Sequence, residues 1–233
     1  ADTTATDCDY RQLSRIYGQM SNIFYQQGLY EQELACEDLS ARYGWKGNDP
    51  LAAICSLAGK IYVYKKQKKS DSAIIICEKI IYLLDSCGYR KQSASYYVSI
   101  LRELVDKGDI LKAKEYMAKY ENESGYFDSN NNIEKGREAY YYSKGYYYMA
   151  TNQYDSAEYF FRKELQDGKD YNNQNGGSKG LALLFQKKHM PDSAAKYALY
   201  SYAMNDSVYA QRAMKEVEQM QGMYDYSRNQ ELA

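Results

Sequence analysis

Few residues of this chain have the types and spacing that catalysis requires. His189 is the only histidine among 233 residues, so histidine-based metal sites and catalytic triads lack their other parts. It directly precedes Met190, Pro191 and Asp192, a combination typical of a tight turn in which a solvated side chain is expected. We therefore predict that the chain is not an enzyme and that it holds no cofactor and no metal.

The five cysteines are scattered and include no CxxC pair, whereas a zinc site needs clustered ligands. Cys55 and Cys77 lie in apolar segments with a helical pattern, where a free cysteine packs like a small hydrophobic side chain. We expect the thiols to be core residues. A bridge such as Cys77–Cys87 is the alternative.

Two further segments have some features of ligand-binding loops. Residues 128–134 suggest a calcium loop, but its sixth position is Ile133 instead of glycine and its twelfth is Ala139 instead of glutamate. The glycine-rich residues 176–180 follow no strand, which argues against a phosphate-binding loop. We predict simple connections over the stretches rich in Asn, Gly and Ser, namely 42–50, 121–135 and 167–179.

Composition points to a folded helical protein. The net charge is −1, with 45% hydrophobic and 26% charged residues, so no global field attracts nucleic acid or membrane. No apolar run approaches the roughly 18 residues of a transmembrane helix. Only two prolines occur beside 29 tyrosines. This combination favours long helices, and tyrosine suits surfaces that both pack and bind.

The segment 140–165 shows how these residues are organised. Tyr141, Gly145 and Tyr148 follow each other at i, i+4 and i+7, on one face of a helix. Asn152 and Gln153 interrupt this pattern. A second helix then begins near the capping residue Asp155, and its apolar stripe contains Ala157, Phe160, Phe161 and Leu165. The pattern predicts an αα-hairpin.

The same hairpin can be found four more times. Aligning the small residue at the start of each second helix gives positions 33, 73, 113, 157 and 194, so the spacings by subtraction are 40, 40, 44 and 37. In the degenerate first copy this position is Glu33. A period near 40 residues is typical of a solenoid of stacked helix pairs.

These residues resemble the tetratricopeptide repeat (TPR) family over about residues 14–204. The fourth copy departs from the family pattern at Lys144 and Lys169, and the periods exceed the usual repeat length. The resemblance implies an all-α, right-handed superhelix of about five repeats, in which Gly145 and Ala157 face each other at the closest approach of two helices. The predicted core residues of the repeats are Ala73, Ala113, Tyr141, Gly145, Tyr148, Ala157, Phe161 and Ala194.

The resemblance also implies a binding groove, which the TPR family lines with fixed positions of each first helix. The residues at these positions form a basic and aromatic set of candidates: Tyr62, Lys65, Lys66, Arg102, Tyr142, Tyr146, Lys179 and Lys187. Such a groove suits a protein or peptide with acidic character or a free C-terminal carboxylate. Alternatively, the tyrosines only pack between repeats, and the lysines lie at helix C-termini because the helix dipole favours cations there. Single-stranded nucleic acid is disfavoured by the neutral total charge.

The ends of the chain complete the predicted organisation. Residues 1–13 are expected to be a flexible segment, 14–204 the repeat array and 205–233 a C-terminal capping helix that continues further. This helix should start at Asn205 or Asp206, with Val217, Met220 and Tyr224 recurring on its inner face. We expect that face to pack on Ala194, Tyr197, Ala198 and Ser201.

The C-terminal segment resembles the juncture in bacterial proteins whose extracytoplasmic TPR region precedes a membrane helix and a signalling domain. This resemblance implies a binding module in a larger membrane-associated regulatory protein, located in the periplasm. Any membrane contact would then come from segments outside this sequence, and the C-terminal helix is a candidate homodimer contact. The alternative is a free-standing cytoplasmic adaptor or co-chaperone.

Overall fold

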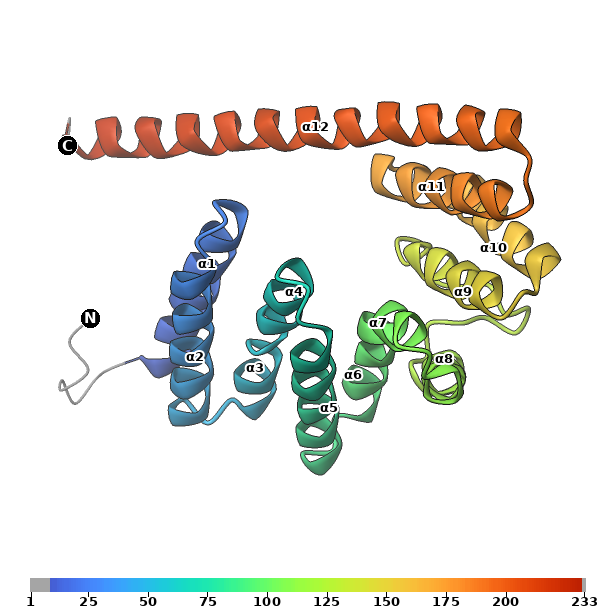
Figure 1. The fold of residues 1–233 in the computed structure, drawn as a ribbon. Helices are drawn as coiled ribbons and strands as arrows, with labels where there is room; N and C mark the ends of the chain where they lie inside the picture. Colours follow the sequence, from blue (N-terminus) through green and yellow to red (C-terminus); the bar gives the residue numbers. More distant parts are fainter. Residues whose placement is uncertain (1–8, 232–233) are drawn as a thin grey trace. The chain divides into compact units, whose positions relative to one another are not determined.

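The fold was analysed in a computed structural model, which describes the backbone of residues 9–231 and the side chains as far as Lys215, except Arg212. Every regular element in this range is a helix, and the helices form antiparallel pairs (Figure 1). The prediction of an all-α fold built from helical hairpins is confirmed. The chain divides into two compact units, one ending at Asn132 and the other beginning at Ile133.

The first unit contains three hairpins, in which the first helix is continuous only once. Hairpin 1 consists of α1 (Tyr10–Gln26) and α2 (Tyr30–Lys46). In hairpin 2, α3 (Pro50–Cys55) and α4 (Ala58–Lys66) precede α5 (Ser70–Ser86). In hairpin 3, α6 (Arg90–Tyr96), the 3₁₀ helix η1 (Tyr97–Ile100) and α7 (Leu101–Asp106) precede α8 (Ile110–Glu123).

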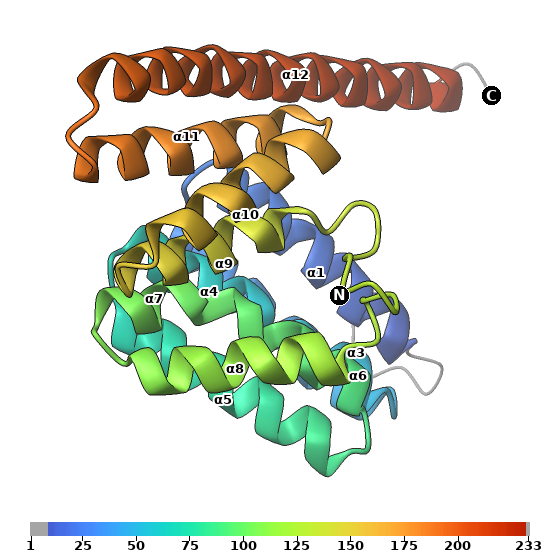
Figure 2. The ribbon, with the colours of Figure 1, turned by 90° about the vertical axis from the view of Figure 1, so that its right-hand side faces the viewer.

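The second unit contains two hairpins. Hairpin 4 pairs α9 (Ala139–Ala150) with α10 (Tyr154–Asp167), and hairpin 5 pairs α11 (Tyr171–Lys187) with α12 (Pro191–Glu231). Helix α12 has 41 residues against 17 in α11, and it runs beside α11 and well beyond it (Figure 2). In the described part of the chain, no helix is both long and apolar enough to span a bilayer.

One turn geometry joins the two helices of every hairpin. Its middle residue has a positive φ of 53–80° in all five cases, at Gly28, Lys68, Gly108, Asn152 and His189. The next residue donates its backbone N–H to a carbonyl five residues back, at 2.8–2.9 Å. This bond closes the C-terminus of the first helix. The predicted repeat period is confirmed. His189, the only histidine, is the residue with positive φ in the turn of hairpin 5.

The predicted connections are correct in one case and wrong in two. Residues 121–135 lie largely between α8 and α9, as expected. There Asp128 Oδ1 accepts the backbone N–H groups of Asn130 and Asn132 at 2.9 and 2.8 Å. The prediction over 42–50 is too long, because α2 continues to Lys46. The prediction over 167–179 is wrong, because α11 starts at Tyr171 and includes the glycine-rich stretch.

Close packing between helices explains why α9 and α11 contain glycines. The ring of Phe161 on α10 lies between Gly145 of α9 and Gly180 of α11. A Cβ atom on Gly145 would be 2.7 Å from the ring, and one on Gly180 would overlap it. At Gly177, a Cβ atom would lie 2.8 Å from the Phe161 carbonyl oxygen. Glycine destabilises a helix, and this loss is offset by the close packing of neighbouring helices that glycine permits. The predicted Gly145–Ala157 contact is corrected: the neighbour of Gly145 is Phe161, and Ala157 is buried in the same cluster.

The C-terminal prediction also needs correction. Helix α12 passes through Asn205 and Asp206 without a break, because no glycine or proline lies there to end it. Residues 205–231 continue the helix that contains Ala194 and Ala198, so they cannot fold back onto those residues. The side chains of Val217, Met220 and Tyr224 lie outside the described part. At the other end, the predicted flexible segment 1–13 is too long, because α1 begins at Tyr10.

Candidate functional site

In the first unit, the predicted groove residues lie on α4 and α7. Tyr62 and Lys66 of α4 are exposed, Tyr62 by 51% of its surface. Arg102 of α7 is also exposed, and its Nε is 3.5 Å from Asp106 Oδ2 one turn further on the same helix. These three side chains are therefore accessible to a ligand.

Lys65 has a structural contact that the sequence analysis did not anticipate. Its Nζ donates to the backbone carbonyl of Ser99 at 2.7 Å and lies 3.3 Å from Glu103 Oε1. Glu103 is buried. Because Lys65 belongs to hairpin 2 and both partners belong to hairpin 3, this lysine joins two repeats. A buried carboxylate needs such a partner. The sequence alone shows only that the two residues carry opposite charges.

In the second unit, the tyrosines of α9 pack closely. Tyr142 and Tyr146 stack with ring centroids 6.1 Å apart, and Tyr142 lies 5.8 Å from the ring of Phe161. Both are half-buried against the core. Tyr141 is buried, and its hydroxyl accepts the Ile133 N–H at 3.1 Å. Tyr148 is half-buried and stacks on Phe160 at 5.5 Å. The two neighbouring tyrosines, Tyr140 and Tyr147, are also buried, which was not predicted from the sequence.

A cleft of about 1040 Å³ opens between α11 and α12. Of the two predicted groove residues on α11, Lys179 lines the cleft together with Leu183 and Gln186, whereas Lys187 lies outside it. The α12 wall is formed mainly by small residues. The full lining is Asn175, Lys179, Ala182, Leu183, Gln186, His189, Met190, Pro191, Ala194, Ala195, Ala198, Ser201, Tyr202 and Asn205.

The cleft is largely apolar with a polar rim. Among its lining residues Lys179 carries the only fixed charge, and no carboxylate is present. Amide side chains contribute donors and acceptors, and Tyr202 is 68% exposed. Two lining residues bind each other, since the Ser201 hydroxyl donates to Asn175 Oδ1 at 2.6 Å. This chemistry suits an apolar ligand surface that also carries an acidic group.

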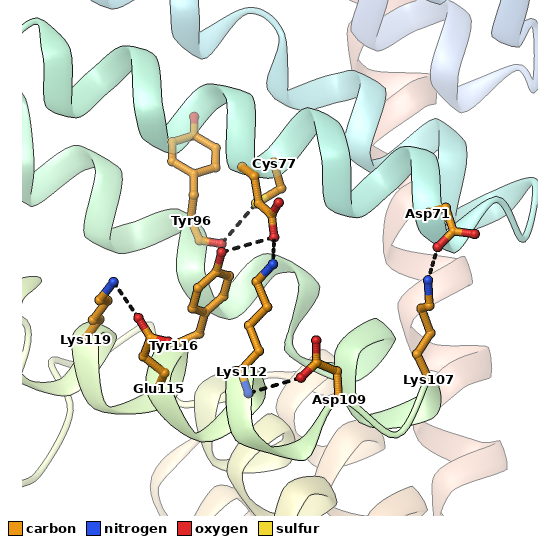
Figure 3. A network of polar contacts seen from close by, with 10 residues as sticks. Asp71, Cys77, Tyr96, Lys107, Asp109, Lys112, Glu115, Tyr116 and Lys119 are labelled. Carbon is orange, nitrogen blue, oxygen red and sulfur yellow. Dashed lines mark hydrogen bonds and ion pairs between the residues drawn. The ribbon is translucent and has the colours of Figure 1, made fainter.

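A polar network between α5, α6 and α8 holds two hairpins together (Figure 3). The carboxylate of Glu78 on α5 pairs with Lys112 and accepts the Tyr116 hydroxyl at 3.2 Å, both from α8. The Cys77 thiol donates to the Tyr96 carbonyl at 3.4 Å, and burial raises its pKa to about 12. A thiol with that pKa is protonated at neutral pH. The network fixes hairpin 2 against hairpin 3 and offers no nucleophile.

Three buried glutamates have raised pKa values. Burial, together with the mutual repulsion of two carboxylates, raises the pKa of Glu33 to about 7. Burial likewise raises the pKa of Glu37 to about 7, although the Ser21 hydroxyl donates to it at 2.8 Å. Burial raises the pKa of Glu164 to about 10. Glu33 and Glu37 face Gly59 in tight packing, so they lack the access that a catalytic site needs.

The part of the chain with described side chains contains no group of three His, Cys, Asp or Glu residues placed to hold a metal ion. The α11/α12 cleft is the candidate functional site.

Comparison with known proteins identifies the fold. No protein-family model matches the chain, and no curated protein matches it. Among solved structures it resembles nearly identical TPR-like repeats of a Podosopora anserina protein described as a kinesin light chain. The TM-score is 0.58 and the identity 12%, over 87% of this chain and 99% of the other. BtubC (BKLC) from P. vanneervenii matches with a TM-score of 0.52 and 11% identity, over 88% and 93% of the two chains. The chain thus has the fold of TPR-like helical repeats.

Proposed function

We propose that the chain is a non-enzymatic scaffold that binds a protein or peptide. The observation that carries this proposal is the open cleft between α11 and α12, which offers apolar walls, amide groups and one lysine without an opposing carboxylate. Each TPR-like repeat contacts only its neighbours, so hairpin 5, the last repeat that the structure describes, leaves this surface open. The preferred ligand is a peptide with acidic character, held by apolar contact and by Lys179.

We further propose that this scaffold is the interaction region of a larger, membrane-associated bacterial regulatory protein in the periplasm. The resemblance of the C-terminal segment to such junctures supports this assignment. A free-standing cytoplasmic adaptor is the competing assignment. A fusion of the complete gene product to alkaline phosphatase distinguishes the two, because that enzyme is active only after export.

Peptide binding can be tested with an array of acidic, neutral and basic peptides, followed by fluorescence anisotropy on the best binders. We expect acidic peptides to bind, and Lys179→Glu to weaken binding at least tenfold. Lys187→Glu is the matched control, because Lys187 lies on the same helix outside the cleft. Equal weakening by both substitutions would show a nonspecific charge effect and contradict the assignment of the cleft.

A further inference from the structure

The cleft lies where a following helix would be expected. Counting from the hairpin turns, each residue of hairpin 5 corresponds to the residue 37 positions earlier in hairpin 4. Ala194, Ala198 and Ser201, which line the cleft, then correspond to Ala157, Phe161 and Glu164. The latter three are buried, each with at most 1% of its surface exposed. They lie beneath α11, the first helix of the next hairpin.

The same three positions are buried in every earlier hairpin: Glu33, Glu37 and Ser40 in hairpin 1, Ala73, Cys77 and Ile80 in hairpin 2, and Ala113, Met117 and Tyr120 in hairpin 3. In hairpin 5, by contrast, Ala198 is exposed, and Ala194 and Ser201 are only half-buried. Within the described side chains, hairpin 5 alone leaves this surface open. The cleft is therefore an unfilled position for a first helix.

We propose that an amphipathic helix of a partner protein fills this position, packing on α11 and α12 as α11 packs on α9 and α10. This inference deepens the proposed function, on which it rests, by naming the ligand as a helix and giving its docking geometry. Helix-in-groove recognition uses the same side-chain packing that joins successive repeats.

The size of the side chains predicts what the partner helix must present. In hairpin 4, the large ring of Phe161 meets the small residues Gly145 and Gly180. In hairpin 5, the corresponding residues are Ala198 and Ala182, and both line the cleft. Small residues on both walls leave space that only the incoming helix can fill. Its central residue should therefore be Phe, Leu or Met, since close-packed interfaces leave few voids.

Charge further restricts the partner. Lys179 is the only lining residue with a fixed charge, and it lies one turn before Ala182 on α11. A helix with a carboxylate one turn from its central apolar residue can pair with it, whereas a basic helix would be repelled. The geometry thus favours an acidic amphipathic helix.

A second copy of this chain is the alternative occupant. Among the exposed apolar residues of α12, Leu199 and Tyr209 lie outside the cleft, whereas Tyr202 lines it. The oligomeric state of the variants described below distinguishes this occupant from a partner helix.

The proposal can be tested with three designed 18-residue helical peptides, labelled with a fluorophore. The first has an apolar face with a central Phe and a Glu one turn away. The second carries Ala instead of Phe, and the third carries Lys instead of Glu. We expect the first peptide to bind with at least tenfold higher affinity than either of the others in fluorescence anisotropy.

Two substitutions then locate the bound helix. Ala198→Phe introduces the residue that fills this position in hairpin 4, and should reduce binding of the first peptide at least tenfold. Leu199→Phe is the matched control, because it adds a ring at an exposed neighbour outside the cleft, and should retain binding. Circular dichroism and thermal melting verify the fold of each variant. If Ala198→Phe does not fold, Lys179→Glu serves instead and should reverse the preference between the Glu and Lys peptides.

Several outcomes would overturn the proposal. Equal binding to Ala198→Phe and Leu199→Phe, or no preference among the three helices, would exclude the cleft as a helix site. Acidic peptides from the array could still bind elsewhere, in which case the proposed function would survive. A dimer in size-exclusion chromatography that Ala198→Phe dissociates, and Leu199→Phe does not, would identify a second copy as the occupant.

Discussion

The ring of Phe161 shows how single side chains fix the distances between helices in the second unit. It occupies the space left by the missing side chains of Gly145 and Gly180, on the two neighbouring helices. Because interiors are close-packed, an added methyl group at either glycine must displace the ring or the helix. The size of Phe161 and the absence of a Cβ atom at the glycines are thus one coupled feature.

This coupling predicts the effect of Gly180→Ala. We expect the free energy of unfolding to fall by about 1–3 kcal/mol, the usual cost of overpacking. Phe161→Leu should recover part of that loss in the double variant, because the smaller side chain makes room. Urea denaturation of the four proteins in a double-mutant cycle measures the coupling. Additive losses would contradict the contact, and Lys179→Ala, exposed on the same helix, should change little.

The carboxyl groups of Glu33 and Glu37 form a second coupled feature. Both are buried against Gly59 of α4. Lys60 and Asp38 are the charged groups that influence Glu37, and they pair with each other at 2.5 Å. Water is excluded, so the neutral form of each carboxyl is favoured and each pKa rises to about 7. In the unfolded chain the same groups would titrate near their ordinary value of about 4.5.

These pKa values predict how stability depends on pH. Between about pH 4.5 and 7 the folded state holds protons that the unfolded state has released, so the free energy of unfolding falls as pH rises through this range. Glu33→Gln removes one such group. It should stabilise the protein at pH 8 by on the order of 1 kcal/mol or more, since one pKa unit corresponds to about 1.4 kcal/mol.

The measurement is thermal or urea unfolding at pH 4.5 and pH 8 for the wild type, Glu33→Gln and Glu31→Gln. Glu31 is exposed on the same helix and controls for the loss of a surface charge. A steeper pH dependence in Glu33→Gln than in the wild type would contradict the burial of a neutral carboxyl.

Among the structural elements, the hairpin turn is the most regular feature. Its middle residue has a positive φ in every repeat, and the residue type varies from Gly28 and Gly108 to Lys68, Asn152 and His189. Residues with a Cβ atom are strained in this conformation by roughly 1 kcal/mol, whereas glycine is not. The packing of the helices therefore imposes the turn geometry, even where the residue in the turn is strained by its positive φ.

The turns predict opposite effects of reciprocal substitutions. Gly108→Ala should destabilise the protein by about 1 kcal/mol, because the new Cβ atom meets its own backbone at a φ of 80°. Lys68→Gly, at a φ of 58°, should stabilise it by up to about 1 kcal/mol. Urea midpoints measure both. Changes of the same sign in the two variants would show that these residues do not share one turn conformation.

At the scale of the whole molecule, helix α12 is longer than one repeat requires. Helix α11, with its 17 residues, spans about 25 Å at 1.5 Å per residue. It can therefore cover only the first part of the 41-residue α12. Tyr200 and Ser201 of α12 donate to Gln174 and Asn175 of α11 at 2.9 and 2.6 Å. Val208 is the last residue of α12 described as buried.

Two truncations test where the stabilising part of α12 ends. A chain ending at Lys215 retains Val208 and should melt within a few degrees of the full chain. A chain ending at Ala203 loses Val208, whose burial is worth about 1.5–3 kcal/mol, and should melt at a clearly lower temperature. Differential scanning calorimetry distinguishes the two. Equal melting temperatures for all three chains would show that α12 beyond Ala203 does not stabilise hairpin 5.

The helical class, the repeat period and the turns at Asn152 and His189 could be predicted from the sequence alone. Apolar spacing, small residues such as Ala73, Ala113 and Ala157, and breaks such as Asn152 act over a few residues, so they can be read locally. The candidate site was only partly predictable. Lys179, which lines the cleft, was among the predicted groove positions of the first helices, but the neighbouring wall on α12 was not predicted.

Features that depend on a neighbour distant in the chain are visible only in the three-dimensional structure. Helix α11 includes the glycines of residues 171–180, and Gly177 and Gly180 lie where α10 packs too closely for a side chain. Lys65 is held by hairpin 3. The cleft exists because no described helix covers Ala198 as α11 covers Phe161. Local propensity acts within one helix, whereas close approach and open surface depend on which helix lies next in space.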